Sequence, residues 1–225
     1  MHDKTKKFLL WGLDLLINGV IIFGLVLIIQ KWIIAPFDVS GASMCNTLNF
    51  IDGNCTNDYG EKIIINEATY LFNEPERGDI VVFNPNPTED KYFIKRVIGL
   101  PGETVEIKDG KVYVTDKNGN TTTLEENYLN ENNKDNTKVY FSDFAVFEVP
   151  DDHYFVLGDN RQASTDSRSC FESTINEDCK NTKEKAFVKR ELIRGKAWVV
   201  WWPLKNARAI DHPDYPNISE SLEEK

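Results

Sequence analysis

Residues that bind metal ions or activate hydroxyl nucleophiles are scarce in this sequence. It has three histidines, His2, His153 and His212, and no His-Glu-x-x-His pattern. Its four cysteines form no Cys-x-x-Cys pair. Zinc sites are usually built from such closely spaced ligands, so the sequence predicts no metal site. The scattered histidines also argue against a Ser-His-Asp triad, because only His153 lies near the polar motifs described below.

Positive charge is also in deficit. The chain holds 26 basic and 36 acidic residues, a formal net charge of −10. The imbalance lies after residue 35, where 22 basic residues stand against 34 acidic ones, a net charge of about −12. Nucleic acids and anionic lipid surfaces attract basic patches. We therefore expect no nucleic-acid partner and no electrostatic docking on anionic lipid.

One long apolar run stands out against this polar background. Residues 8–29 read FLLWGLDLLINGVIIFGLVLII, and a helix of that length rises about 33 Å, enough to cross a hydrocarbon core. A cleavable signal peptide would have a shorter apolar run that ends in a small-residue cleavage site. No Ala-x-Ala pattern follows here. We predict a permanent transmembrane anchor over residues 1–35 and a separate domain over residues 36–225.

Basic residues set the predicted orientation of the anchor. Lys4, Lys6 and Lys7 precede the apolar run, and flanks rich in lysine remain in the cytoplasm. The prediction is a single-pass protein of the cell membrane. Its N-terminus is cytoplasmic, and the domain that follows the anchor is extracytoplasmic.

The four cysteines suit an external location, because disulfides persist in oxidising compartments. Cys45 and Cys55 form one local pair and Cys170 and Cys179 another, although four cysteines allow three connectivities. The segment between Cys170 and Cys179 is acidic and has few apolar residues that could hold it by packing. We predict a disulfide between these two cysteines.

Beyond residue 34 the sequence is typical of a mostly β, antiparallel domain. Short runs rich in β-branched and aromatic residues alternate with turn residues. The predicted strands are 63–65, 79–83, 93–98, 104–107, 111–114, 145–149, 154–157 and 196–202. Asp109-Gly110 predicts a two-residue hairpin turn, and Asn118-Gly119 a weaker one. Residues 103–150 are therefore interpreted as a hairpin-rich insertion, whose polar part, 116–138, is expected to be exposed.

Three tryptophans fall in the run WVVWWP at 198–203. Indole rings are favoured at membrane interfaces, so these side chains could contact the bilayer. The alternative is a buried strand, because the run has strong β propensity. We favour burial for at least Trp198.

Four segments combine small, charged and hydroxyl residues in a fixed order. They are SGASMCNTL at 40–48, RGDIVVF at 77–83, YFIKRVIGLPGE at 92–103, and GDNR at 158–161 followed by Ser164, Asp166, Ser167 and Arg168. In this order behind an N-terminal anchor, they resemble the conserved boxes of bacterial type I signal peptidases. The resemblance runs from the anchor to about residue 203. It is specific, because each box is several residues long.

The resemblance implies a serine endopeptidase with Ser43 as nucleophile and Lys95 as general base. A serine hydroxyl needs an adjacent base, and a lysine can serve once desolvation lowers its pKa from about 10.4. Phe93 and Val97 would share the strand face of Lys95 and provide an apolar environment. Such an enzyme cleaves the signal peptides of exported preproteins through an acyl-enzyme and needs no cofactor.

Supporting roles follow from the same resemblance. Ser164 matches a serine that hydrogen-bonds the lysine and orients it. Asp159, Asp166 and Arg168 match residues that brace the site through ion pairs. These four are expected to hold the catalytic pair in place and not to touch the substrate.

Stabilisation of the oxyanion is the least determined part of the predicted site. The backbone N–H of Ser43 is the natural first donor. Gly41 stands where some relatives place a serine hydroxyl that serves as a second donor. Asn46 departs from the family, which usually has proline in its Ser-Met-x-Pro-Thr-Leu box. A Cys45–Cys55 bridge would offer the loop an alternative source of rigidity.

The implied partners are the signal peptides of secreted preproteins, the lipid bilayer and the secretion machinery. Two other functions fit parts of the sequence. A self-cleaving repressor uses the same pair of residues, but the anchor and the lysine-rich N-terminus disfavour it. A membrane-tethered binding domain without activity would not require both Ser43 and Lys95, and both are present.

Overall fold

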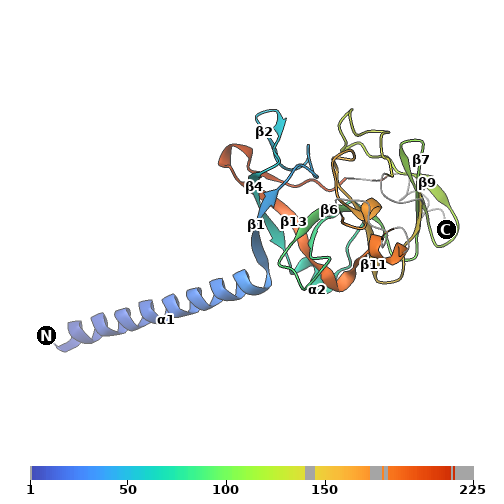
Figure 1. Cartoon of the computed structure of the whole chain (residues 1–225). Helices are drawn as coiled ribbons and strands as arrows, with labels where there is room; N and C mark the ends of the chain where they lie inside the picture. Colours follow the sequence, from blue (N-terminus) through green and yellow to red (C-terminus); the bar gives the residue numbers. More distant parts are fainter. Residues whose placement is uncertain (1, 140–144, 173–178, 180–181, 214, 216–225) are drawn as a thin grey trace.

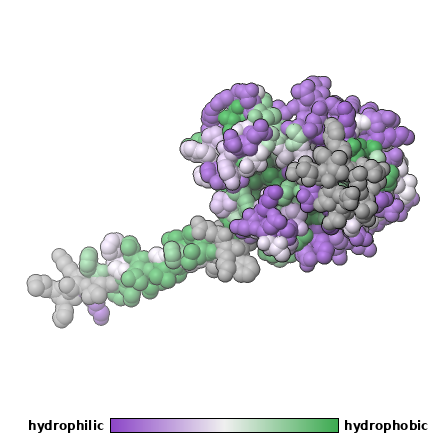
Figure 2. Space-filling view, viewed as in Figure 1, coloured by the Kyte–Doolittle hydropathy of each residue, from purple (hydrophilic) through white to green (hydrophobic). Residues whose placement is uncertain are grey.

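The structure is a computed structural model that describes residues 2–139, 145–172, 179, 182–213 and 215. A long helix, α1 (His2–Trp32), projects from a β-rich domain (Figure 1). Its stretch Lys6–Leu27 has a mean hydropathy of 2.1 and is long and apolar enough to cross a membrane. None of that stretch is buried against the domain, and Figure 2 shows a largely hydrophobic surface along the helix. The predicted N-terminal apolar helix is confirmed.

One antiparallel sheet forms most of the domain, with the strand order β1-β4-β13-β5-β6-β11-β12 and β14 beside β13. Its strands are β1 (Ile34–Ser40), β4 (Tyr59–Asn66), β5 (Ile80–Phe83), β6 (Phe93–Gly99), β11 (His153–Leu157), β12 (Val188–Lys189), β13 (Ile193–Trp202) and β14 (Arg208–Ala209). The short helices are α2 (Thr69–Phe72), η1 (Ser167–Ser169), η2 (Lys183–Ala186), η3 (Arg190–Leu192) and η4 (Leu204–Asn206).

A second antiparallel sheet has the order β10-β7-β8-β9 and carries the predicted hairpins. Its strands are β7 (Thr104–Lys108), β8 (Lys111–Thr115), β9 (Thr121–Thr123) and β10 (Val146–Glu148). Asp109 and Gly110 join β7 to β8 with φ angles of 52° and 81°, as a type I′ turn requires. A separate hairpin pairs β2 (Phe50–Ile51) with β3 (Asn54–Cys55). The predicted mostly β, antiparallel fold is confirmed.

Each predicted strand is present. The strands without a prediction are β1 and the short β2, β3, β9, β12 and β14, and β1 matters most for the site. Pro36 lies inside β1, and proline is rare in strands because it cannot donate a ladder hydrogen bond. Edge strands tolerate proline, and β1 is the terminal strand of the main sheet. This edge position decides where Ser43 lies, because the loop that carries it follows β1 directly.

Apolar packing against the main sheet fixes the loop that carries Ser43. Met44 and Leu48 are 1% and 0% exposed and pack with Ile63, Val82 and Val200 on one face of the main sheet. Burying a side chain of this size contributes about 1.5–3 kcal/mol. The sheet therefore holds the stretch of the loop that follows Ser43.

Both local disulfides are present. Cys45 and Cys55 are joined, with their Cα atoms 5.9 Å apart, so the loop after Ser43 is tied to the β2–β3 hairpin. Cys170 and Cys179 are joined as predicted, with their Cα atoms 5.7 Å apart. Residues 173–178 between them lie outside the described residues.

The expected burial of Trp198 is wrong, since its side chain is 53% exposed. Successive side chains of a strand point to opposite faces of the sheet. On β13, Ala197 is 3% exposed and takes the inner face, which turns its neighbour Trp198 outward. The pairing of β13 with β4 shifts register between Ala197 and Val199, so Val200, which is 0% exposed, also takes the inner face. Trp201 and Trp202 are also exposed, at 38% and 45%.

The expected exposure of residues 116–138 holds only for part of the segment. The stretch 116–121 is exposed or partly so, whereas several later side chains are buried: Leu124, Glu126, Leu129, Asn133 and Thr137. The polar composition hid this burial, because the buried Glu126 and Thr137 are satisfied by Arg161, which is distant in the sequence. Residues 140–144 of the predicted insertion lie outside the described residues.

Candidate active site

Ser43 and Lys95 lie side by side, although 52 positions separate them. Ser43 is on the loop that follows β1, and Lys95 is on β6. The Nζ atom of Lys95 lies 2.8 Å from Ser43 Oγ and 2.8 Å from the carbonyl oxygen of Ile94. Gly41 has a φ of 85°, a left-handed conformation that favours glycine and turns the chain between β1 and Ser43. The structure thus brings the two predicted residues into hydrogen-bond contact.

Lys95 occupies an apolar environment. Its residue is 3% exposed, and Nζ lies 5.5 Å from the centroid of the Phe93 ring. Burial lowers the pKa of Lys95 to about 8, although the carboxylates of Asp166 and Asp159 oppose this by favouring the ammonium form. With a pKa of about 8, about a tenth of the lysine is neutral at pH 7. A neutral amine beside a hydroxyl can accept its proton.

The turn at 158–161 touches the nucleophile loop directly. The N–H of Asn160 donates to the carbonyl oxygen of Ser43 at 2.9 Å, and Asn160 Nδ2 donates to the carbonyl oxygen of Ala42 at 3.0 Å. At Gly158, a Cβ atom would come within 2.5 Å of the Ser43 carbonyl oxygen and would also collide with Ser164. Only glycine fits there, so this residue permits the close approach of the two loops.

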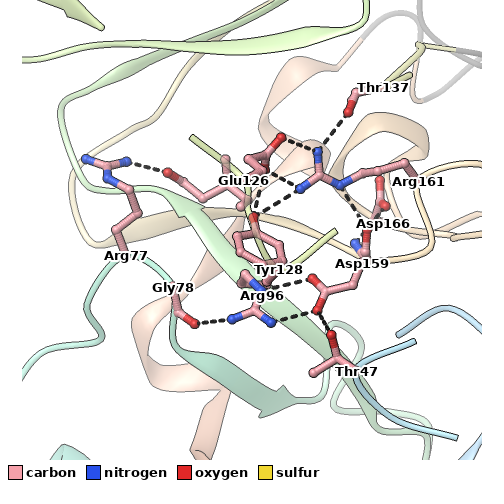
Figure 3. Close-up of polar contacts among 12 residues, drawn as sticks. Thr47, Arg77, Gly78, Arg96, Glu126, Tyr128, Thr137, Asp159, Arg161 and Asp166 are labelled. Atoms are coloured by element: carbon pink, nitrogen blue, oxygen red, sulfur yellow. Dashed lines mark hydrogen bonds and ion pairs between the residues drawn. The ribbon is translucent and has the colours of Figure 1, made fainter. Parts of the chain in front are cut away.

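Two buried ion pairs involve the residues to which the resemblance assigns a supporting role. Arg96 binds both carboxylate oxygens of Asp159 at 2.9 and 2.7 Å, and Asp159 also accepts a 2.5 Å hydrogen bond from Thr47 (Figure 3). Arg168 binds both oxygens of Asp166 at 2.9 and 2.7 Å. Burial alone would raise the pKa of Asp166, but the charge and hydrogen bonds of Arg168 lower it. Bidentate charged pairs of this kind fix geometry as well as charge.

Ser164 does not make its expected contact. In the described part of the chain, its buried Oγ has no hydrogen-bond partner, whereas Lys95 Nζ is engaged by Ser43 and Ile94. The Ser164 hydroxyl lies close enough to Asp166 to favour its charged form without meeting the geometry of a hydrogen bond. Its place against Gly158 makes it a neighbour of the site but not a partner of the lysine.

A cleft of about 1000 Å³ opens over Ser43 and Lys95. Its walls are residues 36–43 on one side and 90–95 on the other, and Ile63 and Val82 also line it. The N–H of Gly41 donates to the carbonyl oxygen of Asp58 at 3.4 Å, so this amide is already used. Apart from its chain neighbours, no described residue has a heavy atom within 4 Å of the position of a Cβ on Gly41, so the space beside this residue is open.

One constellation in the described part of the chain has metal-ligand composition. Glu76, Asp79 and His212 place ligand atoms within 4.8 Å of one another. Asp79 already pairs with Lys196 and, at 3.1 Å, with His212. Burial would raise the pKa of Asp79, but hydrogen bonds from His212 and Lys196 lower it to about 2. Lys196 and His212 therefore already neutralise the Asp79 carboxylate. Glu76, Asp79 and His212 do not line the cleft.

Sequence reasoning did not assign Arg96, Thr47, Glu126 or Tyr128. A signal existed for Arg96, because it follows Lys95 within an apolar strand, and alternation sends it to the opposite face, where a buried guanidinium needs an anion. Thr47 lies within a matched box, but the partner of its hydroxyl, Asp159, is 112 positions away in the sequence. Glu126 and Tyr128 lie in a polar run without a motif, and nothing local distinguishes them.

Comparison with known proteins agrees with the boxes. The family described as signal peptidase, peptidase S26, matches residues 13–202. Signal peptidase I S of Bacillus subtilis (strain 168) is 38% identical over 171 residues, which cover 74% of this chain and 82% of that protein. Signal peptidase I P of Bacillus subtilis subsp. natto is 34% identical over 197 residues, which cover 86% of this chain and 98% of that protein.

A solved structure of a signal peptidase I from Enterococcus faecalis V583 is 34% identical and aligns with a TM-score of 0.38 over 55% of this chain and 97% of that one. The extent of the family match and the identity and coverage of the Bacillus proteins settle the relationship. This chain belongs to the signal peptidase family, peptidase S26.

Proposed function

We propose that this protein is a membrane-anchored serine endopeptidase that removes signal peptides from exported preproteins, with Ser43 as nucleophile and Lys95 as general base. Membership of the signal peptidase family supports a peptidase that cleaves signal peptides. The observation that carries the assignment of residues is the 2.8 Å contact between Lys95 Nζ and Ser43 Oγ at the cleft. Lys95 is buried and its amine contacts the Ser43 hydroxyl directly, so it is positioned to deprotonate it.

The reaction follows from the two protonation states of Lys95. The neutral amine takes the Ser43 proton as Oγ attacks the carbonyl carbon of the scissile bond. The tetrahedral intermediate collapses as the C–N bond breaks, and the Lys95 ammonium returns its proton to the departing amine. Lys95 then takes a proton from a water molecule whose oxygen attacks the carbonyl carbon of the Ser43 ester. The ester C–O bond breaks to release the signal peptide, and the Lys95 ammonium returns its proton to Ser43 Oγ. The N–H of Ser43 is the proposed donor to the oxyanion, and Gly41 leaves room beside it.

The substrate is proposed to bind as an extended strand. β1 is the edge of the main sheet, and an exposed edge can pair with an added peptide strand. The wall opposite β1 is formed by residues 90–95. An extended peptide between the two walls would place a carbonyl carbon at Ser43, with small side chains directed into shallow pockets.

The anchor would place this cleft close to the bilayer. α1 ends at Trp32 and β1 begins at Ile34, and seven strand residues span about 23 Å. The site would therefore lie within about 30 Å of the membrane surface, where the cleavage region of a membrane-held preprotein emerges. We propose residues 1–35 as a single-pass anchor with a cytoplasmic N-terminus, and residues 36–225 as an extracytoplasmic catalytic domain. The bilayer and the secretion machinery are its proposed partners.

Purified full-length protein in detergent tests the proposal. A synthetic preprotein with an Ala-x-Ala junction should be cut once, directly after the second alanine, with product termini identified by mass spectrometry. Lys189→Ala, a change of an exposed lysine outside the cleft, serves as the control for Lys95→Ala. Absence of cleavage by the wild-type protein, or cleavage by Ser43→Ala, would refute the proposal. Products from the chain's own sequence would instead favour self-cleavage.

A further inference from the structure

A polar segment, residues 124–138, packs against residues 158–168, which support the Ser43 loop. We refer to it as the inner segment. Glu126 is 9% exposed and Thr137 is 2% exposed, although the composition of this stretch suggested an exposed loop. Its backbone also serves the site, because Gln162 Nε2 donates to the carbonyl oxygen of Asn132 at 2.5 Å. The inner segment therefore contacts the box at 158–168 through both side chains and main chain.

Glu126 reaches the nucleophile loop through Arg161. Its two carboxylate oxygens accept hydrogen bonds from both terminal nitrogens of Arg161, one of them at 2.8 Å (Figure 3). Arg161 is fully buried, and its Nε donates to the carbonyl oxygen of Gly158 at 3.1 Å. Gly158 begins the turn in which Asn160 holds the carbonyl oxygen of Ser43. The carboxylate thus fixes one end of the turn that supports the nucleophile.

Tyr128 reaches the same turn by a second route. Its hydroxyl donates to Glu126 at 2.7 Å, and its ring lies 4.0 Å from the guanidinium carbon of Arg96. Burial and the charge of Glu126 raise the pKa of Tyr128 well above its ordinary value, so the hydroxyl stays protonated and donates. Arg96 binds Asp159, which accepts the hydrogen bond of Thr47 on the nucleophile loop. Both routes converge on the turn at 158–161.

We propose that Glu126 and Tyr128 are positioning residues for the Ser43–Lys95 pair, acting through Arg161 and Arg96 on the turn at 158–161. The inference rests on the proposed function. It adds an element from outside the matched boxes to the machinery that holds the nucleophile. Neither residue touches the substrate, and each acts through an arginine.

The expected effect is large because the contacts are buried and directional. A misplacement of about 1 Å at a reacting atom can cost about 100-fold in rate. Removing one partner of a buried ion pair also destabilises a fold, because it leaves an uncompensated buried charge. A loss of activity in a Glu126 variant could therefore come from either cause, and the experiment has to separate them.

The chain offers a matched control in the ion pair between Arg77 and Glu103. Glu103 is 9% exposed, as Glu126 is, and it binds Arg77 Nη2 at 2.6 Å. Its other oxygen accepts a hydrogen bond from the N–H of Leu100, at the turn before β7 and away from the 158–161 turn. Glu103→Gln should therefore lower the melting temperature about as much as Glu126→Gln does, without moving the nucleophile.

Cleavage of the Ala-x-Ala preprotein is measured for both variants at alkaline pH, where Lys95 is neutral, and at a temperature where each is folded. Glu126→Gln should lower kcat about 10- to 100-fold with KM changed less than about threefold. Glu126→Asp, which retains the charge, should recover part of kcat, and Tyr128→Phe should show a smaller loss. Glu103→Gln should keep kcat within about twofold of wild type. Equal losses in the two glutamine variants, or a wild-type kcat in Glu126→Gln, would overturn the inference.

A second readout does not depend on the substrate. The side-chain amine of Lys95 is titrated by NMR in lysine-labelled protein and assigned by its absence in Lys95→Ala. The groups that act on Lys95 are Asp166, Asp159 and Arg168. Glu126→Gln should loosen the turn at 158–161, which carries Asp159, so this carboxylate would favour the ammonium form less and the Lys95 midpoint should fall. Glu103→Gln should leave the midpoint unchanged. An unchanged midpoint in Glu126→Gln would refute positioning even where cleavage fails, whereas an inactive wild type would refute only the proposed function.

Discussion

The rate of cleavage should depend on pH through Lys95 alone over the range from pH 7 to pH 9. Burial lowers the pKa of this lysine to about 8, so the neutral fraction is about 0.09 at pH 7 and about 0.9 at pH 9. The value of kcat/KM should therefore rise about tenfold over these two pH values and then level off. A solvated lysine with a pKa of about 10.4 would instead give a rise of about 100-fold and no plateau below pH 10.

The assay uses initial rates at substrate concentrations well below KM, in buffers of constant ionic strength. The melting temperature is recorded at each pH, because unfolding would distort the profile. The folded pKa of Lys95 lies below its unfolded value, so the unfolded chain binds more protons between about pH 8 and pH 10.4. The destabilisation due to Lys95 is fully present below pH 8 and is relieved as pH rises through this window. A profile still climbing at pH 10 would refute a desolvated lysine base, and a profile flat between pH 7 and pH 9 would refute a Lys95 pKa of about 8.

Three further outcomes follow from the same geometry. Ser43→Ala and Lys95→Ala should each abolish cleavage while circular dichroism shows an intact fold, and the double variant should lose no more, because the two act as a unit; substantial activity at neutral pH in Lys95→Ala would exclude it as the base. Gly158→Ala should lower kcat at least about tenfold, since its methyl group would come within 2.5 Å of the Ser43 carbonyl oxygen, and a wild-type rate would contradict the tight contact. Removing the Cys170–Cys179 bridge by paired serine substitutions should lower the free energy of unfolding by at most about 2–3 kcal/mol. It should slow cleavage by more than this loss of stability explains. Alkylation of either cysteine in fully active wild-type protein would show that the bridge is not needed for activity.

The order of the elements and the identity of the reactive residues could be predicted from the sequence. Strand alternation, turn dipeptides such as Asp109-Gly110 and the long apolar run are local signals, and each describes a conformation that a short peptide already prefers. Ser43 and Lys95 could be paired because their boxes resemble those of a family, in which the fold brings such boxes together. The spacing of 52 residues between them carries no such information by itself.

Local sequence patterns did not determine which side chains of a strand or loop would be buried or which partners they would bind. Trp198 lies in a run that has strong β propensity, yet it points outward, because the pairing of β13 with β4 and β5 assigns Ala197 and Val200 to the inner face. Ser164 matches its box, but its hydroxyl makes no bond to Lys95 among the described residues, since Ser43 and Ile94 engage the amine. One-residue differences in register decide such outcomes.

The sequence by itself determined the apolar helix, the β-rich domain and the chemistry available at Ser43 and Lys95, because these depend on composition and on neighbouring residues. Only the tertiary structure decided that Glu126 would be buried against Arg161, 35 positions away. It also decided how completely Lys95 is buried away from solvent. A polar side chain in a polar run is indistinguishable from its exposed neighbours until the chain closes around it. Burial and charge pairing are set by contacts between distant segments, and these contacts determine both the pKa of Lys95 and the placement of Ser43.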